Sequence, residues 1–253
     1  GEGMTGLVAA SRPERLVSDR PLRLDTYPGV LLVHNGYVDL FAVATEDGEP
    51  VGARRHILRV EQGGIVCGFP AMGNAVVIAV GGLDAEIQHL DTLETLTMPS
   101  GAAEAPLDRW IAGLAEAACG ATPAWPEVVA QPGQPVDCAE GARLHGGRGV
   151  LWTCDTSGAF AVLDGDEPVR RALPLTGGFF LRARQPSTCI AQPTGQMAMD
   201  TLLDGLVEFH RLTAEAIARR LETHAQQSQD RLATRQSRDS RTMSRALAYL
   251  ARV

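Results

Sequence analysis

The six histidines are the side chains best suited to binding a metal ion, so their spacing tests one class of enzyme directly. They are His34, His56, His89, His145, His210 and His224. A metal-binding β-roll needs clustered ligands, such as a His-X-His pair followed by a carboxylate, because three or four ligands must converge on one ion. No two of these histidines have that spacing. We therefore predict no metal site and expect each histidine to be structural or at the surface.

The five cysteines could form disulfides, bind zinc or act as nucleophiles. They are Cys67, Cys119, Cys138, Cys154 and Cys189. Their odd number, wide separation and lack of a Cys-X-X-Cys pair argue against a disulfide framework or a zinc ribbon and fit a reducing cytoplasm. Cys67, Cys154 and Cys189 lie in strand-like sequence, which favours buried, inert thiols. A Cys/His hydrolase stays open at this point, because such pairs meet only in three dimensions.

The glycine-rich run Glu61-Gln62-Gly63-Gly64-Ile65-Val66-Cys67-Gly68 resembles the first part of the phosphate-binding cassette of cyclic-nucleotide-binding domains. In that family a Gly-Glu pair follows the glycine-rich turn, and the glutamate holds the ribose hydroxyl. A later arginine clamps the cyclic phosphate. Here Phe69 follows Gly68, and Asn74-Ala75-Val76 stands where the arginine is expected.

This degenerate cassette, with Gly63, Gly64, Gly68 and Asn74 as its remaining candidate positions, lacks both ligand-binding side chains. Losing the guanidinium removes a charge-assisted contact of about 1.5–3 kcal/mol. The resemblance therefore implies a retained shape with no bound cofactor. The chain also contains no lysine and no GxxxxGK(S/T) loop, which excludes ATP hydrolysis by a P-loop in this sequence.

Composition indicates a soluble globular protein of one or two domains. The chain has 253 residues, of which 45% are hydrophobic and 21% charged, and its net charge is −7. The negative charge argues against nucleic acid as a partner. No signal peptide is visible, and the longest apolar runs, such as 75–80, are too short to span a membrane.

Residues 30–70 form the densest strand-like stretch of the chain, and we expect the strands of this stretch to position any site. Asn35-Gly36 between two apolar runs predicts a tight type I′ hairpin, and Glu46-Asp47-Gly48-Glu49-Pro50 predicts a second turn. In the strand that follows, alternation places Arg55 and Arg59 on one face.

A weaker copy of this stretch occurs later in the chain. Four landmarks recur in order: Gly29–Val33 as Gly149–Thr153, Leu40–Val43 as Ala159–Val162, Arg54-Arg55 before Gly63-Gly64 as Arg170-Arg171 before Gly177-Gly178, and Val76–Ala79 as Thr188–Ala191. Coincidence among common strand residues is the alternative to duplication. We predict a mainly β protein with two tandem antiparallel β-rolls of the cyclic-nucleotide-binding or cupin-like jelly-roll type, each followed by a helix.

The expected boundaries follow from proline, glycine and helical periodicity. They are an N-terminal segment at 1–21, with a tag scar at 1–3; a first roll with its helix at 22–120; a proline-rich linker around Trp125 at 121–134; a second roll at 135–199; and a long helix at 200–253. In the helix of the first roll, Leu107, Trp110, Ile111 and Leu114 form a core-facing stripe.

The C-terminal helix should begin near Asp200 and has no Gly or Pro after Gly205. Leu202, Leu206, Phe209, Thr213 and Ile217 form a face that can pack on the second roll. Beyond Leu221 the apolar positions thin out, and a continuous helix would reach about 80 Å. We predict that its second half projects and contacts a partner through Leu232, Met243, Leu247, Leu250, Arg235 and Arg238, with weak homodimerisation at most. A solvated helix face is the alternative.

Several stretches resemble the N-terminal region of NHLM-type bacteriocin-system ABC transporters. They are Leu22–Asp25, Val38–Val43, Glu46–His56, Arg59–Glu61, Gly149–Trp152, Leu173–Leu175 and Phe209-His210. The resemblance implies a cytoplasmic region that precedes membrane-spanning helices and an ATP-binding domain in an exporter of leader-bearing ribosomal peptides.

On that resemblance the chain is a non-catalytic regulatory or docking domain at the cytoplasmic face of the bacterial membrane. Its partners would be the rest of the transporter, and a sister subunit or the leader peptide of the exported substrate are further candidates. The signature of the double-glycine leader peptidase is absent from the sequence. A cyclic-nucleotide sensor and a cupin-like enzyme remain as alternatives.

Overall fold

The computed structural model of the chain describes residues 12–90, 104–121 and 127–252. The first half contains β1 (Glu14–Arg15), β2 (Leu22–Arg23), β3 (Val30–Asn35), β4 (Tyr37–Glu46), β5 (Glu49–Glu61), β6 (Ile65–Cys67), β7 (Ala75–Gly81), β8 (Glu86–Leu90) and α1 (Glu104–Cys119). The second half contains β9 (Val128–Val129), β10 (Val136–Cys138), β11 (Arg143–His145), β12 (Leu151–Thr153), β13 (Phe160–Val162), β14 (Leu173–Leu175), β15 (Leu181–Ala183), β16 (Ser187–Cys189), β17 (Ala191–Pro193), the 3₁₀ turn η2 (Thr194–Gln196) and α2 (Met199–Leu250). The predicted tag scar and Trp125 lie outside the described residues.

The first β-roll consists of two four-stranded antiparallel sheets. Their strand orders are β1-β8-β3-β6 and β2-β7-β4-β5. β1 and β8 pair at Glu14 and Ile87, so the roll begins within the range predicted as an N-terminal segment. The prediction of an antiparallel β-roll is confirmed for this half of the chain.

The predicted hairpin at Asn35-Gly36 is wrong. β3 pairs with β6 and β8, whereas β4 pairs with β5 and β7, so the chain crosses between the two sheets at Gly36. Gly36 has φ 71°, and a Cβ there would lie 3.2 Å from the Cα atom of Ala85. Its positive φ serves the crossing, whereas the two-residue hairpin forms at Asp47-Gly48, with φ values of 50° and 80°.

The predicted shared face of Arg55 and Arg59 is also wrong. A β-bulge shifts the β4–β5 register between Leu40 and Phe41, so that Arg59 faces Asp39 and His56 faces Phe41. The bulge adds one residue to β5 and inverts the alternation beyond it. As a result His56, rather than Arg55, shares the face of Arg59, and both side chains donate hydrogen bonds to Asp39.

The second β-roll consists of shorter strands in three sheets. Their orders are β10-β16, β13-β15-β11-β9 and β14-β12-β17. All their strand pairs are antiparallel except β9 with β11. β9 lies inside the range 121–134 that the sequence predicts as a linker, so at least this part of the range belongs to the roll.

Strand pairing supports the predicted duplication and corrects its alignment. In the first roll β3 lies between β6 and β8, and in the second roll β12 lies in the same way between β14 and β17. Likewise β7 lies between β2 and β4, and β15 lies between β11 and β13. The landmarks in β3 and β4 therefore match their structural counterparts β12 and β13. The last two landmarks, by contrast, were each aligned with the wrong strand of the second roll. Gly63-Gly64 precede β6, whereas Gly177-Gly178 precede β15, which is the counterpart of β7.

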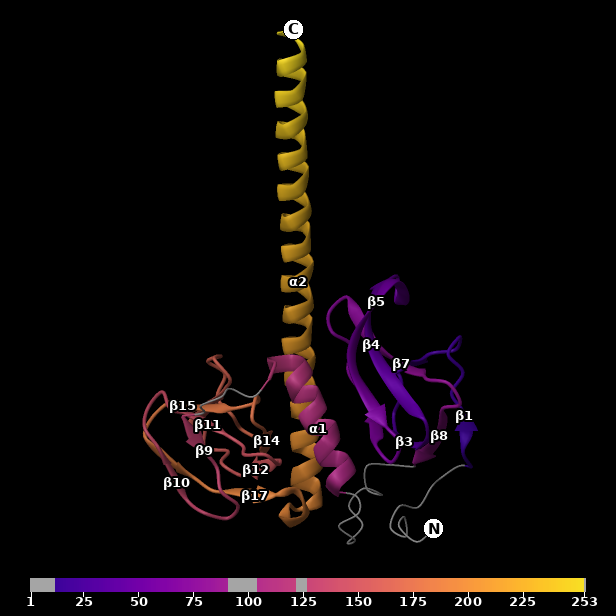
Figure 1. Cartoon of the computed structure of the whole chain (residues 1–253). Helices are drawn as coiled ribbons and strands as arrows, with labels where there is room; N and C mark the ends of the chain where they lie inside the picture. The colour runs from indigo at the N-terminus through magenta and orange to yellow at the C-terminus, as the bar shows by residue number, and fades with distance from the viewer. Residues whose placement is uncertain (1–11, 91–103, 122–126, 253) are drawn as a thin grey trace.

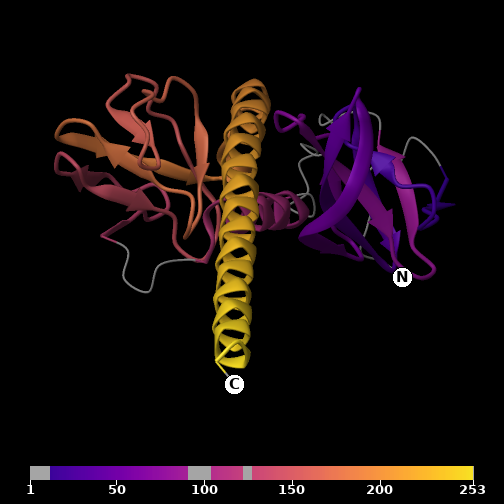
Figure 2. The ribbon, with the colours of Figure 1, turned by 90° about the horizontal axis from the view of Figure 1, so that it is seen from above.

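The two helices occupy the space between the rolls (Figures 1 and 2). α1 lies between α2 and the first roll, and its predicted stripe is buried, with Leu107, Trp110, Ile111 and Leu114 each at most 2% exposed. Gly120, with φ 83°, ends this helix and donates its N–H to the carbonyl of Glu116.

The long helix α2 begins at Met199, and Ala198 rather than Asp200 is its N-cap. Its buried residues end at Ile217, and every residue from 222 to 252 is exposed. Figure 1 shows this second half projecting far beyond both rolls. The predicted division of the helix into an anchored half and a projecting half is therefore confirmed.

One continuous hydrophobic core joins both rolls to both helices. Phe209 of α2 is fully buried and packs edge-to-face on Phe179 of the second roll, with ring centroids 5.0 Å apart. Gly205 permits this approach, because a Cβ there would lie 2.2 Å from the carbonyl oxygen of Ala172. The rolls are thus held on opposite sides of the helices by shared burial.

The two helix-interior glycines should respond oppositely to alanine. Gly205→Ala should lower the free energy of unfolding by about 1–3 kcal/mol, because the added methyl group meets backbone that cannot move away cheaply. Gly113→Ala is the matched control: its Cβ would lie 3.6 Å from Leu58, so the gain in helix propensity should stabilise by up to about 1 kcal/mol. Urea denaturation measures both, and equal stabilisation by the two substitutions would contradict the packing described for α2.

Candidate functional site: the helix joint and the projecting helix

A buried joint connects the first roll, α1 and α2. The indole N–H of Trp110 donates to Nε2 of His210 at 3.0 Å, and the ring of Phe69, from the β6–β7 connection, lies 5.6 Å from the imidazole. All three side chains are less than 10% exposed. The joint therefore brings together residues from three elements that are distant in sequence.

The environment of His210 fixes its charge. Burial among aromatic rings disfavours the imidazolium and lowers the pKa of His210 to about 4. A neutral imidazole can accept the Trp110 hydrogen bond at Nε2, whereas an imidazolium could not. The joint is consequently intact only while His210 is uncharged.

A second polar network connects α1 to the second roll. Trp152 donates its indole N–H to Oγ1 of Thr194 at 3.0 Å, and that hydroxyl donates to the Asp108 carboxylate at 2.6 Å. Trp152 is fully buried. Because Trp110 and Asp108 both lie on α1, this helix holds the two rolls and α2 in one arrangement.

The anchored part of α2 ends where Arg220 caps α1. Its Nη1 group donates to the carbonyl oxygens of Glu116 and Ala117, at 3.3 and 2.8 Å. A cation here also suits the partial negative charge at the C-terminus of α1. Beyond this contact α2 leaves the domain.

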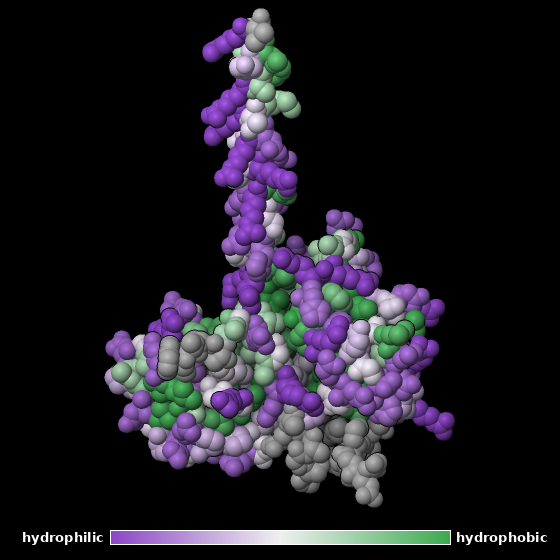
Figure 3. Space-filling view, viewed as in Figure 1, coloured by the Kyte–Doolittle hydropathy of each residue, from purple (hydrophilic) through white to green (hydrophobic). Residues whose placement is uncertain are grey.

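The predicted partner residues lie on the projecting half of α2. Leu232, Met243, Leu247 and Leu250 are 60–68% exposed, and Arg235 and Arg238 are exposed too. Leu232, Met243 and Leu250 are separated by nearly whole numbers of helical turns, so they share one face. Figure 3 shows this part of the helix as mainly hydrophilic, with apolar side chains near its free end.

The predicted cassette residues do not converge on a ligand site. Gly63 and Gly64 form the turn between β5 and β6, and Asn74 is exposed in the turn before β7. A Cβ on Gly68 would lie 2.1 Å from the carbonyl oxygen of Tyr27, so backbone fills the space beside it. Phe69, at the position where the resemblance to the cassette places a glutamate, is 2% exposed and packs into the helix joint.

The other candidate groups for chemistry are dispersed. Within the described ranges, no three His, Cys, Asp or Glu side chains are placed to hold a metal ion. Burial raises the pKa of Cys67, and it raises the pKa of Cys189 to about 12, which disfavours the thiolates that nucleophilic catalysis would need. Cys154 is exposed rather than buried, contrary to the expectation for its strand-like sequence.

Sequence reasoning missed the Trp110–His210 pair and a cleft of about 650 Å³ beside it. The helical stripe correctly marked Trp110 as buried, but nothing in the sequence indicated its partner a hundred positions away. The cleft lies between β5, α1 and α2, and no single stretch of sequence contains it.

Comparison with known proteins gives no family. No protein-family model matches the chain. No curated protein matches it significantly either. Similar solved structures include "cAMP bound PfPKA-R (141-441)", at 10% identity over 81% of this chain and 80% of that one, with a TM-score of 0.27. Another is the regulatory domain of Toxoplasma gondii PKA with cAMP, at 11% identity over 81% and 84%, with a TM-score of 0.25.

TM-scores this low carry no argument about ligand or partner, so the β-roll architecture rests on the strand pairing described above. No helix in the described ranges is long and apolar enough to cross a membrane.

Acidification should weaken the helix joint through His210. The unfolded chain takes up a proton near the ordinary histidine pKa of 6.5, whereas the folded chain does so only near 4. Stability from this group is therefore complete above about pH 6.5 and falls by about 3 kcal/mol as the pH drops to 4. His210→Gln is the matched variant, because it keeps an acceptor for Trp110 without titrating. Denaturation from pH 7 to 4 should show a shallower loss for the variant, and parallel curves would contradict this assignment.

Proposed function

We propose that this chain is a non-catalytic regulatory or docking module whose two rolls anchor α2 and present its projecting half to a partner. The observation that carries the proposal is the division of α2 at Arg220. One half is buried against α1 and the second roll and touches the first roll at Phe69, whereas the other half is exposed and carries an apolar stripe. A continuous helix is a stiff spacer, so the orientation of the rolls and the position of the free end are mechanically coupled.

The cellular context proposed for the module is a peptide-exporting ABC transporter, at the cytoplasmic face of the membrane. This context rests on the sequence resemblance alone. In this arrangement α2 would contact the membrane or ATP-binding parts of the transporter, which the given sequence does not include. The gene region after the codon for Val253 tests the context directly. It should encode membrane-spanning segments and a P-loop, and a stop codon there would contradict it.

Cyclic nucleotides should not bind in the micromolar range. Phe69 fills the position of the ribose-binding carboxylate, and Asn74, Ala75 and Val76 offer no guanidinium to a cyclic phosphate. Calorimetric titration with cyclic AMP and cyclic GMP should give no saturable heat. Low-micromolar binding of either nucleotide would establish the cyclic-nucleotide sensor instead.

Truncation after His224 should leave the two rolls folded. The removed residues are all exposed where the structure describes them, so the melting temperature should change by less than about 2 °C. Thermal denaturation and analytical ultracentrifugation of the full and truncated chains provide the measurement.

The full chain should self-associate only weakly, because Gln236 and Asp239 interrupt its apolar stripe. Unfolding of the rolls on truncation would show that the projecting half is structural.

A further inference from the structure

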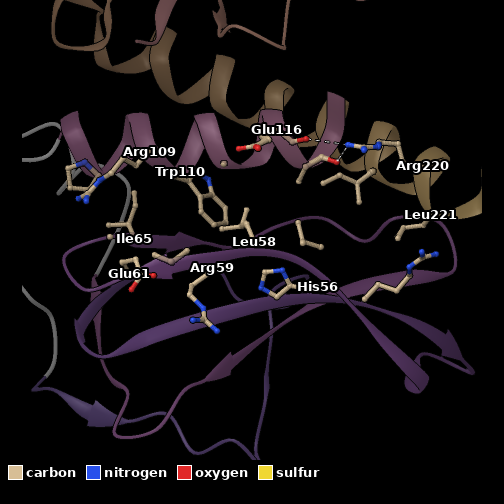
Figure 4. Close-up of a pocket in the computed structure, with 18 of the residues that line it drawn as sticks. His56, Leu58, Arg59, Glu61, Ile65, Arg109, Trp110, Glu116, Arg220 and Leu221 are labelled. Atoms are coloured by element: carbon tan, nitrogen blue, oxygen red, sulfur yellow. Dashed lines mark hydrogen bonds between the residues drawn. The ribbon is translucent and has the colours of Figure 1, made fainter. Parts of the chain in front are cut away.

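The cleft beside the helix joint has walls from three elements (Figure 4). β5 and the start of β6 form one wall, α1 forms the second, and the part of α2 around Arg220 closes one end. Its volume of about 650 Å³ falls within the range of pockets that hold small organic molecules. Among the clefts described in this molecule, it alone borders both the helix joint and the point where α2 leaves the domain.

The inner surface of the cleft is apolar. Trp110, Ile65 and Ile217 are each at most 3% exposed, and the half-buried Leu58 and Leu221 extend this surface. Figure 4 shows the indole of Trp110 beside Leu58, between α1 and β5. Gly113 faces Leu58 without a side chain of its own, which keeps the middle of the cleft open. A ligand body lying here would bury apolar surface on an aromatic ring and aliphatic side chains.

The end of the cleft near Arg220 is mainly basic, with Glu116 of α1 as the acidic residue that lines the cleft nearby. Arg220, Leu221 and His224 line it from α2, while Arg55 and His56 line it from β5. Arg220 is held in place by the carbonyl groups of α1, which leaves its Nε and Nη2 groups available as donors. The backbone of Arg55 pairs with Ala42 of β4, but its guanidinium has no hydrogen bond or ion pair with another residue that the structure describes.

The opposite end of the cleft contains an acidic side chain as well as basic ones. Figure 4 places Glu61, Ile65 and Arg109 there, far from Arg220. Arg59 also lines the cleft, but its guanidinium is occupied by a two-point contact with the Asp39 carboxylate, at 2.9 Å for each hydrogen bond. Partial burial acts to raise the pKa of Asp39, but the hydrogen bonds from Arg59 and His56 outweigh it and keep that pKa below its usual value. The cleft is therefore polarised, with donors available at its Arg220 end.

We propose that this cleft binds a small organic anion with an apolar body. The carboxylate or phosphate head lies between Arg55 and Arg220, and the body lies along Trp110, Leu58 and Ile217. The guanidinium of Arg55 from the β5 wall and that of Arg220 from the end formed by α2 suit an anionic head, and the apolar surface leading away from them suits a chain or ring system. Such a ligand contacts β5, α1 and α2 together, so it also stabilises the helix joint by mass action. The inference concerns the two-roll head and holds whether or not the projecting helix docks to a partner.

Two fluorescent probes of similar shape test the proposal on the full chain. 8-Anilinonaphthalene-1-sulfonate carries an anionic head, and N-phenyl-1-naphthylamine has a similar body without charge. The sulfonate should bind saturably at one site and raise the melting temperature. Arg55→Gln should weaken the sulfonate about fivefold and leave the uncharged probe unchanged. Arg54→Gln is the matched control, because Arg54 is the neighbouring exposed arginine and does not line the cleft.

A blocking variant and competitors locate the site and define the head group. Gly113→Phe should fill the cleft and abolish binding of both probes, whereas Ala112→Phe, on the adjacent exposed position of α1, should retain it. Displacement of the sulfonate by dodecanoate or by dodecyl phosphate distinguishes a carboxylate from a phosphate head, and inorganic phosphate alone should not compete. The proposal is overturned if neither probe saturates, or if Arg55→Gln behaves as Arg54→Gln does. If Gly113→Phe does not fold, the comparison of the Arg55→Gln and Arg54→Gln variants still tests the proposal.

Discussion

The buried hydrogen bond from Trp110 to His210 is the contact on which the arrangement of the two rolls depends. It joins α1 to α2 at the point where Phe69 of the first roll packs against the imidazole. A buried indole N–H without an acceptor would carry a desolvation penalty, so the neutral state of His210 and the position of both helices are linked. The Trp152–Thr194–Asp108 network then extends the same constraint from α1 to the second roll.

Much of the fold could be predicted from local sequence. Apolar runs separated by turn residues identified strands of the first roll, the helical stripe identified the buried face of α1, and the lack of Gly and Pro after Gly205 identified the length of α2. The crossing at Gly36 could not be predicted, because positive φ is compatible with a hairpin and with a change of sheet. Only the pairing partners of β3 and β4 distinguish the two, and those partners are distant in sequence. The bulge between His56 and Leu58 could not be predicted for the same reason.

Less of the candidate sites than of the fold could be predicted from the sequence. The exposed residues of α2 followed from periodicity alone, because a face with sparse apolar positions cannot be core. The cassette resemblance correctly directed attention to Phe69 and Asn74, but sequence could not show that Phe69 is part of the helix joint. The cleft escaped prediction entirely, because Arg55, Trp110 and Arg220 come from three elements. Each of these residues has an ordinary structural role when it is considered alone.

The proposed docking role of α2 also depends on how its projecting half is stabilised. A helix in a protein gains most of its stability in water from tertiary packing, and the residues from 222 to 252 are all exposed. Local pairs such as Gln226 with Asp230 add only tenths of a kcal/mol each. A sequence selected only for a solvated linker gains nothing from excluding Gly and Pro over this whole length. A surface that must reach a partner in fixed register does, because the stripe of Leu232, Met243 and Leu250 is aligned only while the helix is unbroken.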